Sequence, residues 1–259
     1  MLATLYALRQ DLGFAASDTA EDPRLLSCLT AATALIESGA GRRFRPLLAT
    51  RSQSIDLCHP TEIALDADLL TLHSVTHGAN ESIALDQLLV LAGRLVLVNG
   101  QTFRYVNSPE MAVSVTGLWG SHEDWSNAWR VSGDTVQNAP LSSTATTITV
   151  TDADSTDAAG ITPRFQVGQI VQIESEYLSI LAVNTVTNVL TVQRGQHGTA
   201  AATHAQGSVT SVYQPPRAVE NLCLRVAAWL YREPNTVNGT AMPPMLGSAL
   251  AMLRRVRVR

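Results

Sequence analysis

The spacing of apolar residues changes along the chain: near both ends they repeat at helical spacing, and in the middle they alternate as in strands. Near the N-terminus, Asp22 and Pro23 are typical of a helix cap and first turn, and Gly39 and Gly41 mark an end. The apolar stripe between them consists of Leu25, Leu26, Leu29, Ala32, Thr33 and Ile36. A chain of this kind must pack helices beside β structure.

Helical spacing returns near the C-terminus. Pro215 and Pro216 introduce a second stripe, which ends at Glu233 because a residue before proline avoids the helical region. This stripe consists of Val219, Leu222, Cys223, Val226 and Leu230. We also predict a short first helix that ends near Gly13 and a final helix over residues 243–253.

Short β-branched and apolar runs fill the middle of the chain and predict strands. The first group covers residues 47–57, 69–76, 88–98 and 111–118. From Ala139 to Gln214 the composition shifts to Thr, Ser, Val, Ile, Gly and Gln, with further runs at 147–151, 169–173, 177–183, 189–193 and 208–213. We therefore predict an α+β fold in which residues 1–138 and 215–259 form a core of terminal helices and a β region, and residues 139–214 form an inserted small all-β module.

Composition excludes several classes of protein. There is no run of about 20 apolar residues to span a membrane, and the amphipathic start differs from a signal peptide, so we expect synthesis in the cytoplasm and no membrane partner. The three cysteines, Cys28, Cys58 and Cys223, lie far apart and predict neither disulfides nor zinc. We expect them to be buried as small apolar residues.

All 18 basic residues are arginine, and four of them lie among the last six positions. Residues 1–253 thus carry 14 arginines against 22 acidic residues. Such a body repels a phosphate backbone, because nucleic-acid binders rely on clustered cations. We expect no sequence-specific binding of nucleic acid.

No motif indicates a cofactor or a metal. His73 and His77, and likewise His197 and His204, lack the third ligand or glutamate of a zinc site, so we interpret the second pair as turn-supporting. Glycine-rich nucleotide motifs and the nucleophile elbow are also missing from the sequence. We expect no cofactor, no metal and no catalytic residue.

Two other groups of residues have a functional and a structural interpretation. Glu174 and Glu176 lie two apart, a spacing that suits paired-carboxylate hydrolysis, although solvent-facing acids are the commoner case. A tryptophan cluster with His122 suits either sugar stacking or the anchoring of a loop, and we favour anchoring. Its members are Trp119, Trp125 and Trp129.

At the N-terminus, the segment EDPRLLSCLTAATALIESGAGRRF covers residues 21–44. In this segment and in the order of the elements that follow it, the chain resembles the head-tail connector (adaptor) proteins of tailed bacteriophages. Residues 113–130, VSVTGLWGSHEDWSNAWR, are similar to a strand-and-loop passage of longer neck proteins, and residues 222–234, LCLRVAAWLYREP, to their packing helix. The module is similar to a small β domain of phage virion proteins, through RFQVGQIVQIESEYLSIL and NVLTVQRGQHGTAAATHAQGS.

This resemblance implies a structural protein of the virion neck and no enzyme. Its copies would form a ring, about twelve-fold, below the portal, which extends the channel for the packaged DNA and offers a platform to the next neck or tail protein. The alternative is a virion-attached, adhesin-like binding module that uses the β insertion.

The C-terminal tail is the predicted portal contact. Residues 1–253 have an excess of acidic residues, whereas the last six residues contain four arginines and no acid. A segment that combines arginines with apolar side chains is typical of an interface anchor. The predicted contact residues are Met252, Leu253, Arg254, Arg255, Val256, Arg257, Val258 and Arg259.

Overall fold

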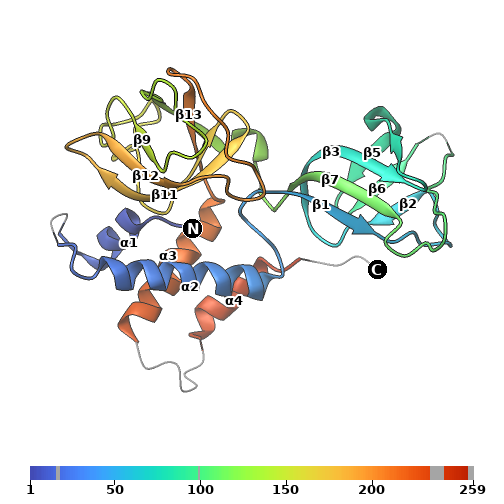
Figure 1. Ribbon diagram of the computed structural model, residues 1–259. Coiled ribbons are helices and arrows are strands. Elements are labelled where there is room, and N and C mark those ends of the chain that lie inside the picture. The colour runs from blue at the N-terminus through green and yellow to red at the C-terminus, as the bar shows by residue number, and fades with distance from the viewer. Residues whose placement is uncertain (16–17, 99, 234–241, 256–259) are drawn as a thin grey trace. The chain divides into compact units, whose positions relative to one another are not determined.

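The computed structural model describes the whole chain except residues 16–17, 99, 234–241 and 256–259 (Figure 1). Helices and antiparallel sheets are both present, which confirms the predicted α+β class. The chain divides into two compact units. Unit 1 comprises Met1–Phe44 and His122–Arg254, and unit 2 comprises Arg45–Ser121 with the C-terminal residues from Arg255.

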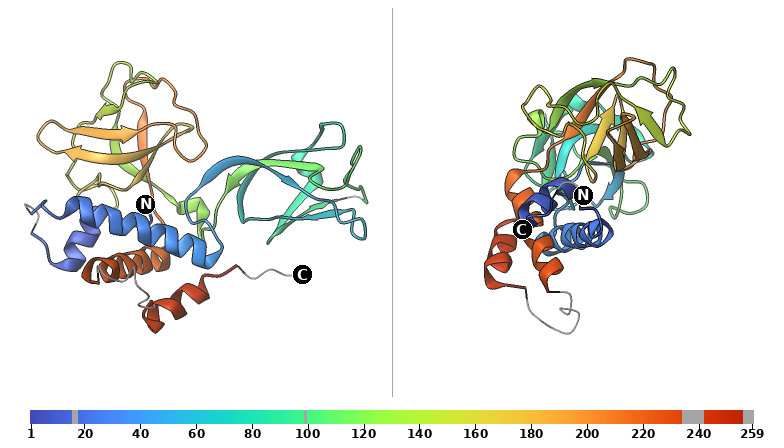
Figure 2. Two further views of the ribbon diagram at one scale, coloured as in Figure 1. Left: turned by 60° about the horizontal axis from the view of Figure 1, so that its bottom comes forward. Right: turned by 90° about the vertical axis from the view of Figure 1, so that its left-hand side faces the viewer.

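Four helices of unit 1 lie where the sequence predicts them: α1 (Leu5–Leu12), α2 (Asp22–Ala40), α3 (Arg217–Arg232) and α4 (Pro244–Met252). The side chain of Thr4 accepts a hydrogen bond from the Ala7 N–H at the start of α1, and left-handed Gly41 ends α2. α2 and α3 lie side by side (Figure 2). Their apolar stripes share one core, in which Leu29 and Cys223 are fully buried. No helix in the described residues is long and apolar enough to cross a bilayer.

The rest of unit 1 is a six-stranded antiparallel sheet in the order β8-β13-β10-β11-β12-β9, which we call the β module. Its strands are β8 (Trp129–Thr135), β9 (Thr147–Thr149), β10 (Ile170–Ile173), β11 (Glu176–Asn184), β12 (Val189–Gln193) and β13 (Val209–Tyr213). A second core, which includes Ile148, Phe165 and Leu178, fills the module. The Leu5 N–H donates to the Val167 carbonyl, so the first helix is tied to the module.

Unit 2 contains two smaller antiparallel sheets around a third core with Val75, Leu95, Val115 and Trp119. The first sheet has the order β1-β7-β3-β4, with β1 (Leu47–Gln53), β3 (Leu69–His77), β4 (Glu81–Ile83) and β7 (Val113–Trp119). The second has the order β2-β6-β5, with β2 (Glu62–Ala64), β5 (Leu88–Leu91) and β6 (Arg94–Leu97). The predicted run 88–98 is therefore a hairpin, because residues 92–93 form a tight turn with Gly93 at positive φ.

The boundaries of the two units differ from the predicted ones, which placed an inserted module at residues 139–214. β8 begins at Trp129 and pairs with β13, so the β module starts before residue 139. The segment inserted between α2 and β8 is residues 45–121. Local patterns miss this arrangement, since the pairing of β8 with β13 joins residues about eighty positions apart along the sequence.

Candidate assembly surfaces

The predicted portal contact begins at the end of α4. Leu246 is buried, and Leu250 packs so closely on Gly39 that an added Cβ would lie 2.5 Å from its Cδ2. The opposite face of α4 is open: Met245 is 71% exposed and Met252 is 86% exposed. No charged residue occurs in the helix. An apolar helix face in water is typical of a surface that another protein covers.

The arginines after α4 already have partners in their own chain. Arg254 donates from Nε to the Gly39 carbonyl at 3.3 Å. Arg255 donates to the Leu65 carbonyl at 2.8 Å and lies 3.4 Å from the carboxylate of Asp68. The remaining predicted contacts, residues 256–259, lie outside the described residues. In the described part of the tail, Met252 is the side chain most available to a partner.

Glu176 corrects the expectation that both module acids face solvent. Its side chain is fully buried, and its two carboxylate oxygens accept hydrogen bonds from Arg194 Nε and Nη2, both at 2.7 Å. The N–H groups of Gly195 and Ala202 and the His204 ring complete its contacts. Burial alone raises the pKa of Glu176, but the bonds from Arg194, Ala202, His204 and Gly195 outweigh burial and lower the pKa to about 2.

Glu174 differs because it lies in the turn between β10 and β11, with φ at 52° and an exposed side chain. Its carboxylate accepts a hydrogen bond from Ser208 and lies 3.1 Å from Nδ1 of the buried His204. The two acids are thus linked through one histidine, and they do not form an open catalytic pair. His204 is a buried link between strands, whereas His197 lies 3.1 Å from Arg43.

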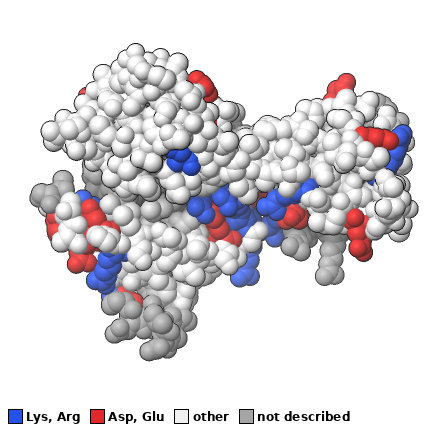
Figure 3. All heavy atoms as spheres, in the orientation of Figure 1, with Lys and Arg blue, Asp and Glu red and all other residues white. Residues whose placement is uncertain are grey.

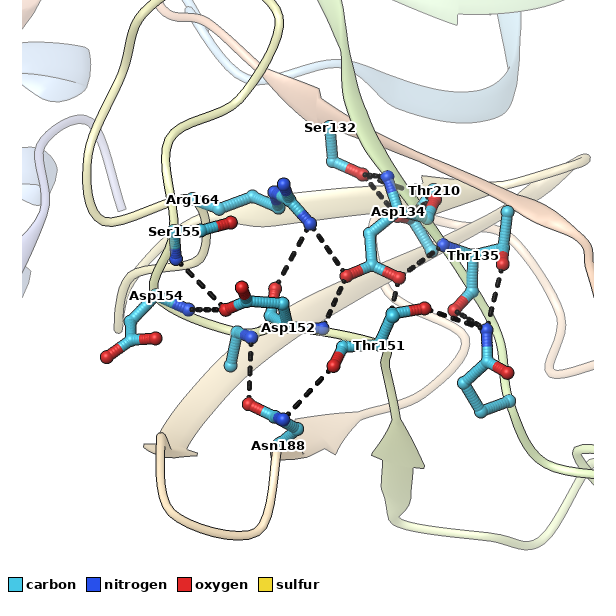
Figure 4. A network of polar contacts seen from close by, with 12 residues as sticks. Ser132, Asp134, Thr135, Thr151, Asp152, Asp154, Ser155, Arg164, Asn188 and Thr210 are labelled. Atoms are coloured by element: carbon cyan, nitrogen blue, oxygen red, sulfur yellow. Dashed lines mark hydrogen bonds and ion pairs between the residues drawn. The ribbon is translucent and has the colours of Figure 1, made fainter.

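A second buried carboxylate organises the other side of the module (Figure 4). Asp134 accepts hydrogen bonds from the N–H groups of Thr135, Thr151 and Asp152 and pairs with Arg164 at 2.8 Å. Burial raises the pKa of Asp134, and the three backbone N–H groups more than offset it, so the pKa is lowered. This site ties β8 to the loop after β9.

The charged side chains of the module are mostly turned inward. Arg130 and Asp157 form a third buried pair. Among the nine charged residues between 129 and 213, a stretch described throughout, only Asp154 and Glu174 are exposed. The module face seen in Figure 3 accordingly shows few charged atoms. Its charges therefore stabilise the fold and leave a largely neutral surface.

The aromatic cluster has other members than the sequence suggests. Trp119 lies in the core of unit 2, where its indole N–H donates to the Ala49 carbonyl. In unit 1, Trp129 stacks on Tyr177 with ring centroids 5.0 Å apart, and burial raises the pKa of Tyr177 to about 12. The ring contacts continue through Trp125, His122 and Tyr213. The rings pack on one another, which favours the anchoring interpretation.

A groove of about 480 Å³, lined about equally by polar and apolar surface, lies within unit 1 beside residues 1–4, the loop at 122–127 and the first turn of α3. Both signs of charge line it, including Asp124, Arg217 and Glu220. Burial raises the pKa of Glu220, and Arg217 partly opposes this. Among the described residues, no group of three or more metal-ligating side chains gathers there or elsewhere. Of the three cysteines expected to be buried, Cys223 is buried, Cys28 is half-buried and Cys58 is exposed.

No family model and no curated protein matches the chain. One solved structure that matches is titled "Neck of empty GTA particle computed with C6 symmetry". The alignment covers 100% of this chain and 92% of that chain, at 14% sequence identity and a TM-score of 0.48. At this TM-score the likeness alone assigns no function to the chain.

Proposed function

We propose that this chain is a structural head-to-tail adaptor of a tailed phage virion. The observation that carries the proposal is α4, a helix without charge that exposes Met245 and Met252 next to an arginine-rich tail. Methionines adapt to a partner surface, and arginines at the rim pair with carboxylates. The proposed partner of this surface, including the tail to Arg259, is the portal protein, in line with the sequence resemblance.

In this proposal the copies form a ring, a dodecamer by the resemblance, below the portal in the virion neck. A cyclic ring needs two different contact faces on each copy, which an asymmetric α+β chain can supply. The chain carries a net charge of −4, and its excess of acidic residues lies before residue 254. Because this negative charge repels the phosphate backbone, DNA passes through the channel without binding to its wall. The free face of the ring offers a platform to the next neck or tail protein.

The β module also supports a structural role. Its arginines are used in three buried ion pairs, Arg130–Asp157, Arg164–Asp134 and Arg194–Glu176. Charges fixed in this way hold loops and strands in register and are withdrawn from solvent. We propose that the neutral module serves as a rigid spacer or contact surface and performs no catalysis.

The test is co-sedimentation with portal rings of the same virion in moderate salt. We expect Met245→Glu with Met252→Glu to abolish binding, because the two carboxylates would enter an apolar contact. Val186→Glu is the matched control, since Val186 is 91% exposed and lies between β11 and β12 of the β module. Deletion of residues 254–259 should weaken binding to the portal. The binding that remains should be resistant to salt, because it depends on the apolar contacts of the two methionines.

Undiminished binding by the double methionine variant refutes α4 as the portal contact. Negative-stain images of the bound wild-type protein test the ring itself, and an absence of closed rings on the portal overturns the adaptor proposal.

A further inference from the structure

Edge strands of a sheet expose unpaired backbone groups, and proteins protect such edges with charge or cover. Of the six edge strands in the described residues, four carry charged residues: Arg51 in β1, Glu62 in β2, Glu81 in β4, and Arg130 with Asp134 in β8. β9 is covered, because Gln137 donates to the Thr149 carbonyl and the Thr149 N–H donates to Asn138. β5, with the sequence Leu-Leu-Val-Leu, has neither protection.

The register of the β5–β6 hairpin shows which backbone groups are open. Leu91 pairs with Arg94 across a two-residue turn, and Leu89 pairs with Val96. The Val98 N–H donates to the Gln87 carbonyl, which continues the same alternation. Odd-numbered residues therefore bond to β6, and the N–H and C=O of Val90 point to the open edge. In the described part of the chain, no other strand pairs with β5.

The side chains of β5 are apolar on both faces of the sheet. Leu89 and Leu91, on one face, are 49% and 37% exposed, and Val90, on the other, is 45% exposed. Leu85, just before the strand, is 47% exposed. A strand that joins this edge must therefore bring uncharged apolar side chains to both faces.

We propose that β5 is an interface between two copies of this chain, which join edge to edge as antiparallel strands about a two-fold axis. Val90 would lie opposite Val90 of the second copy, so that the open N–H and C=O groups of both bond reciprocally. Leu89 would lie opposite Leu91 on one face, and a continuous six-stranded sheet results. An isologous contact of this kind needs one self-complementary patch, and β5 is such a patch.

The other edges of the chain fit β5 less well. Pairing with β2, β4 or β1 would bring Glu62, Glu81 or Arg51 against the exposed leucines, and each of these charges already has an ion-pair partner in its own unit. Desolvating a paired charge beside leucine is unfavourable. The second copy's β5 brings no charge.

This contact is separate from the proposed portal surface on α4, and it differs from the contact that repeats around a ring. A two-fold contact closes at two copies, whereas a ring needs head-to-tail contacts. The inference therefore concerns pairing of the protein in solution and stands or falls independently of the adaptor proposal.

The experiment is sedimentation velocity of the full chain over a concentration series. Wild-type protein should show a monomer–dimer equilibrium, and Val90→Lys should weaken dimerisation at least tenfold. Val186→Lys makes the same change at an exposed site on the β module and should dimerise like the wild type. Val90→Pro removes an outward N–H without removing a bond to β6, and it too should weaken the dimer.

A contact-specific readout accompanies these variants. In a Cys58→Ser background, Val90→Cys should form a covalent dimer on mild oxidation, and Val186→Cys should not. A wild-type protein that stays monomeric at every concentration overturns the inference. Val90→Lys protein that dimerises as tightly as the wild type, with circular dichroism unchanged, also overturns it.

Discussion

Replacing Glu176 with glutamine tests whether the buried charge network holds the β module together. Glu176→Gln keeps the shape of the side chain and removes its charge, so Arg194, whose side chain is only 6% exposed, loses its anionic partner. The backbone N–H groups of Gly195 and Ala202 both donate to the carboxylate of Glu176. In glutamine one of the two oxygens is replaced by an NH2 group, which would face these donors and could not accept their hydrogen bonds.

The pKa of Glu176 sets the magnitude of this effect. A carboxyl group whose pKa falls from its ordinary value of 4.5 to about 2 on folding contributes about 3 kcal/mol to stability at neutral pH. The Glu176 carboxylate has no exposed surface, but its partner Arg194 also bonds to an exposed backbone carbonyl, so solvent screens part of this contribution and about 3 kcal/mol is its upper limit. Breaking one partner of a buried ion pair costs about 3–5 kcal/mol in general, which agrees.

Urea unfolding at pH 7 measures the effect, and hydrogen exchange of β10 and β11 shows whether the loss lies in the module. Glu174→Gln is the matched control, because Glu174 contacts the same histidine from an exposed position and should change stability by less than about 0.5 kcal/mol. Equal stability of Glu176→Gln and wild type would show that the buried charge of Glu176 does not stabilise the β module.

The pH dependence of the same pair of proteins gives an independent check. Folding lowers the pKa of Glu176, so its contribution is fully present above the unfolded value of about 4.5 and is lost as the pH falls toward 2. The difference in unfolding free energy between wild type and Glu176→Gln should therefore shrink between about pH 5 and pH 2. A difference that stays constant over this range would exclude the ionised carboxylate as its cause.

Three further changes test the fold. Gly117→Ala should destabilise unit 2 by more than about 1 kcal/mol in thermal melts, because the new Cβ would lie 2.3 Å from the Thr71 carbonyl oxygen; a wild-type melt contradicts the β3–β7 packing. Leu29→Asp should abolish soluble expression, because Leu29 is fully buried between helices. A short Gly-Ser bridge in place of residues 45–121 should leave a cooperative melt of unit 1, whereas the same bridge in place of residues 139–214 should not, since it removes β13 from β8.

The helices and most of the strands follow from the amino-acid sequence, because these elements depend on residues only a few positions apart along the chain. The stripe from Leu25 to Ile36 faces one core as its spacing predicts, and left-handed Gly41 ends the helix. The five strands predicted after residue 139 all exist, with ends that differ from the prediction by no more than two residues. The α+β class follows from these elements alone.

The positions of the charged side chains, in contrast, depend on the tertiary structure. Arg130 and Asp134 make the β8 segment look like a polar loop, yet both are buried because Asp157 and Arg164 reach them from distant positions. The burial of Glu176 is also not evident from the sequence pattern, because its partner Arg194 is 18 residues away. The spacing of Glu174 and Glu176 indicates only that both lie on the same face of a strand. The periodicity of a sequence shows which residues are polar. Whether two charged residues form a buried ion pair depends on which strands and loops pack against each other in the fold.

The division into units and the surfaces left open are likewise tertiary properties. The apolar run at residues 88–98 predicts one strand, but the turn at Gly93 folds it into a hairpin and leaves β5 as an edge. The same composition is core in β6, where Leu95 is fully buried, and surface in β5. Long-range pairing makes this difference, because each strand's neighbours decide whether its backbone and side chains are covered.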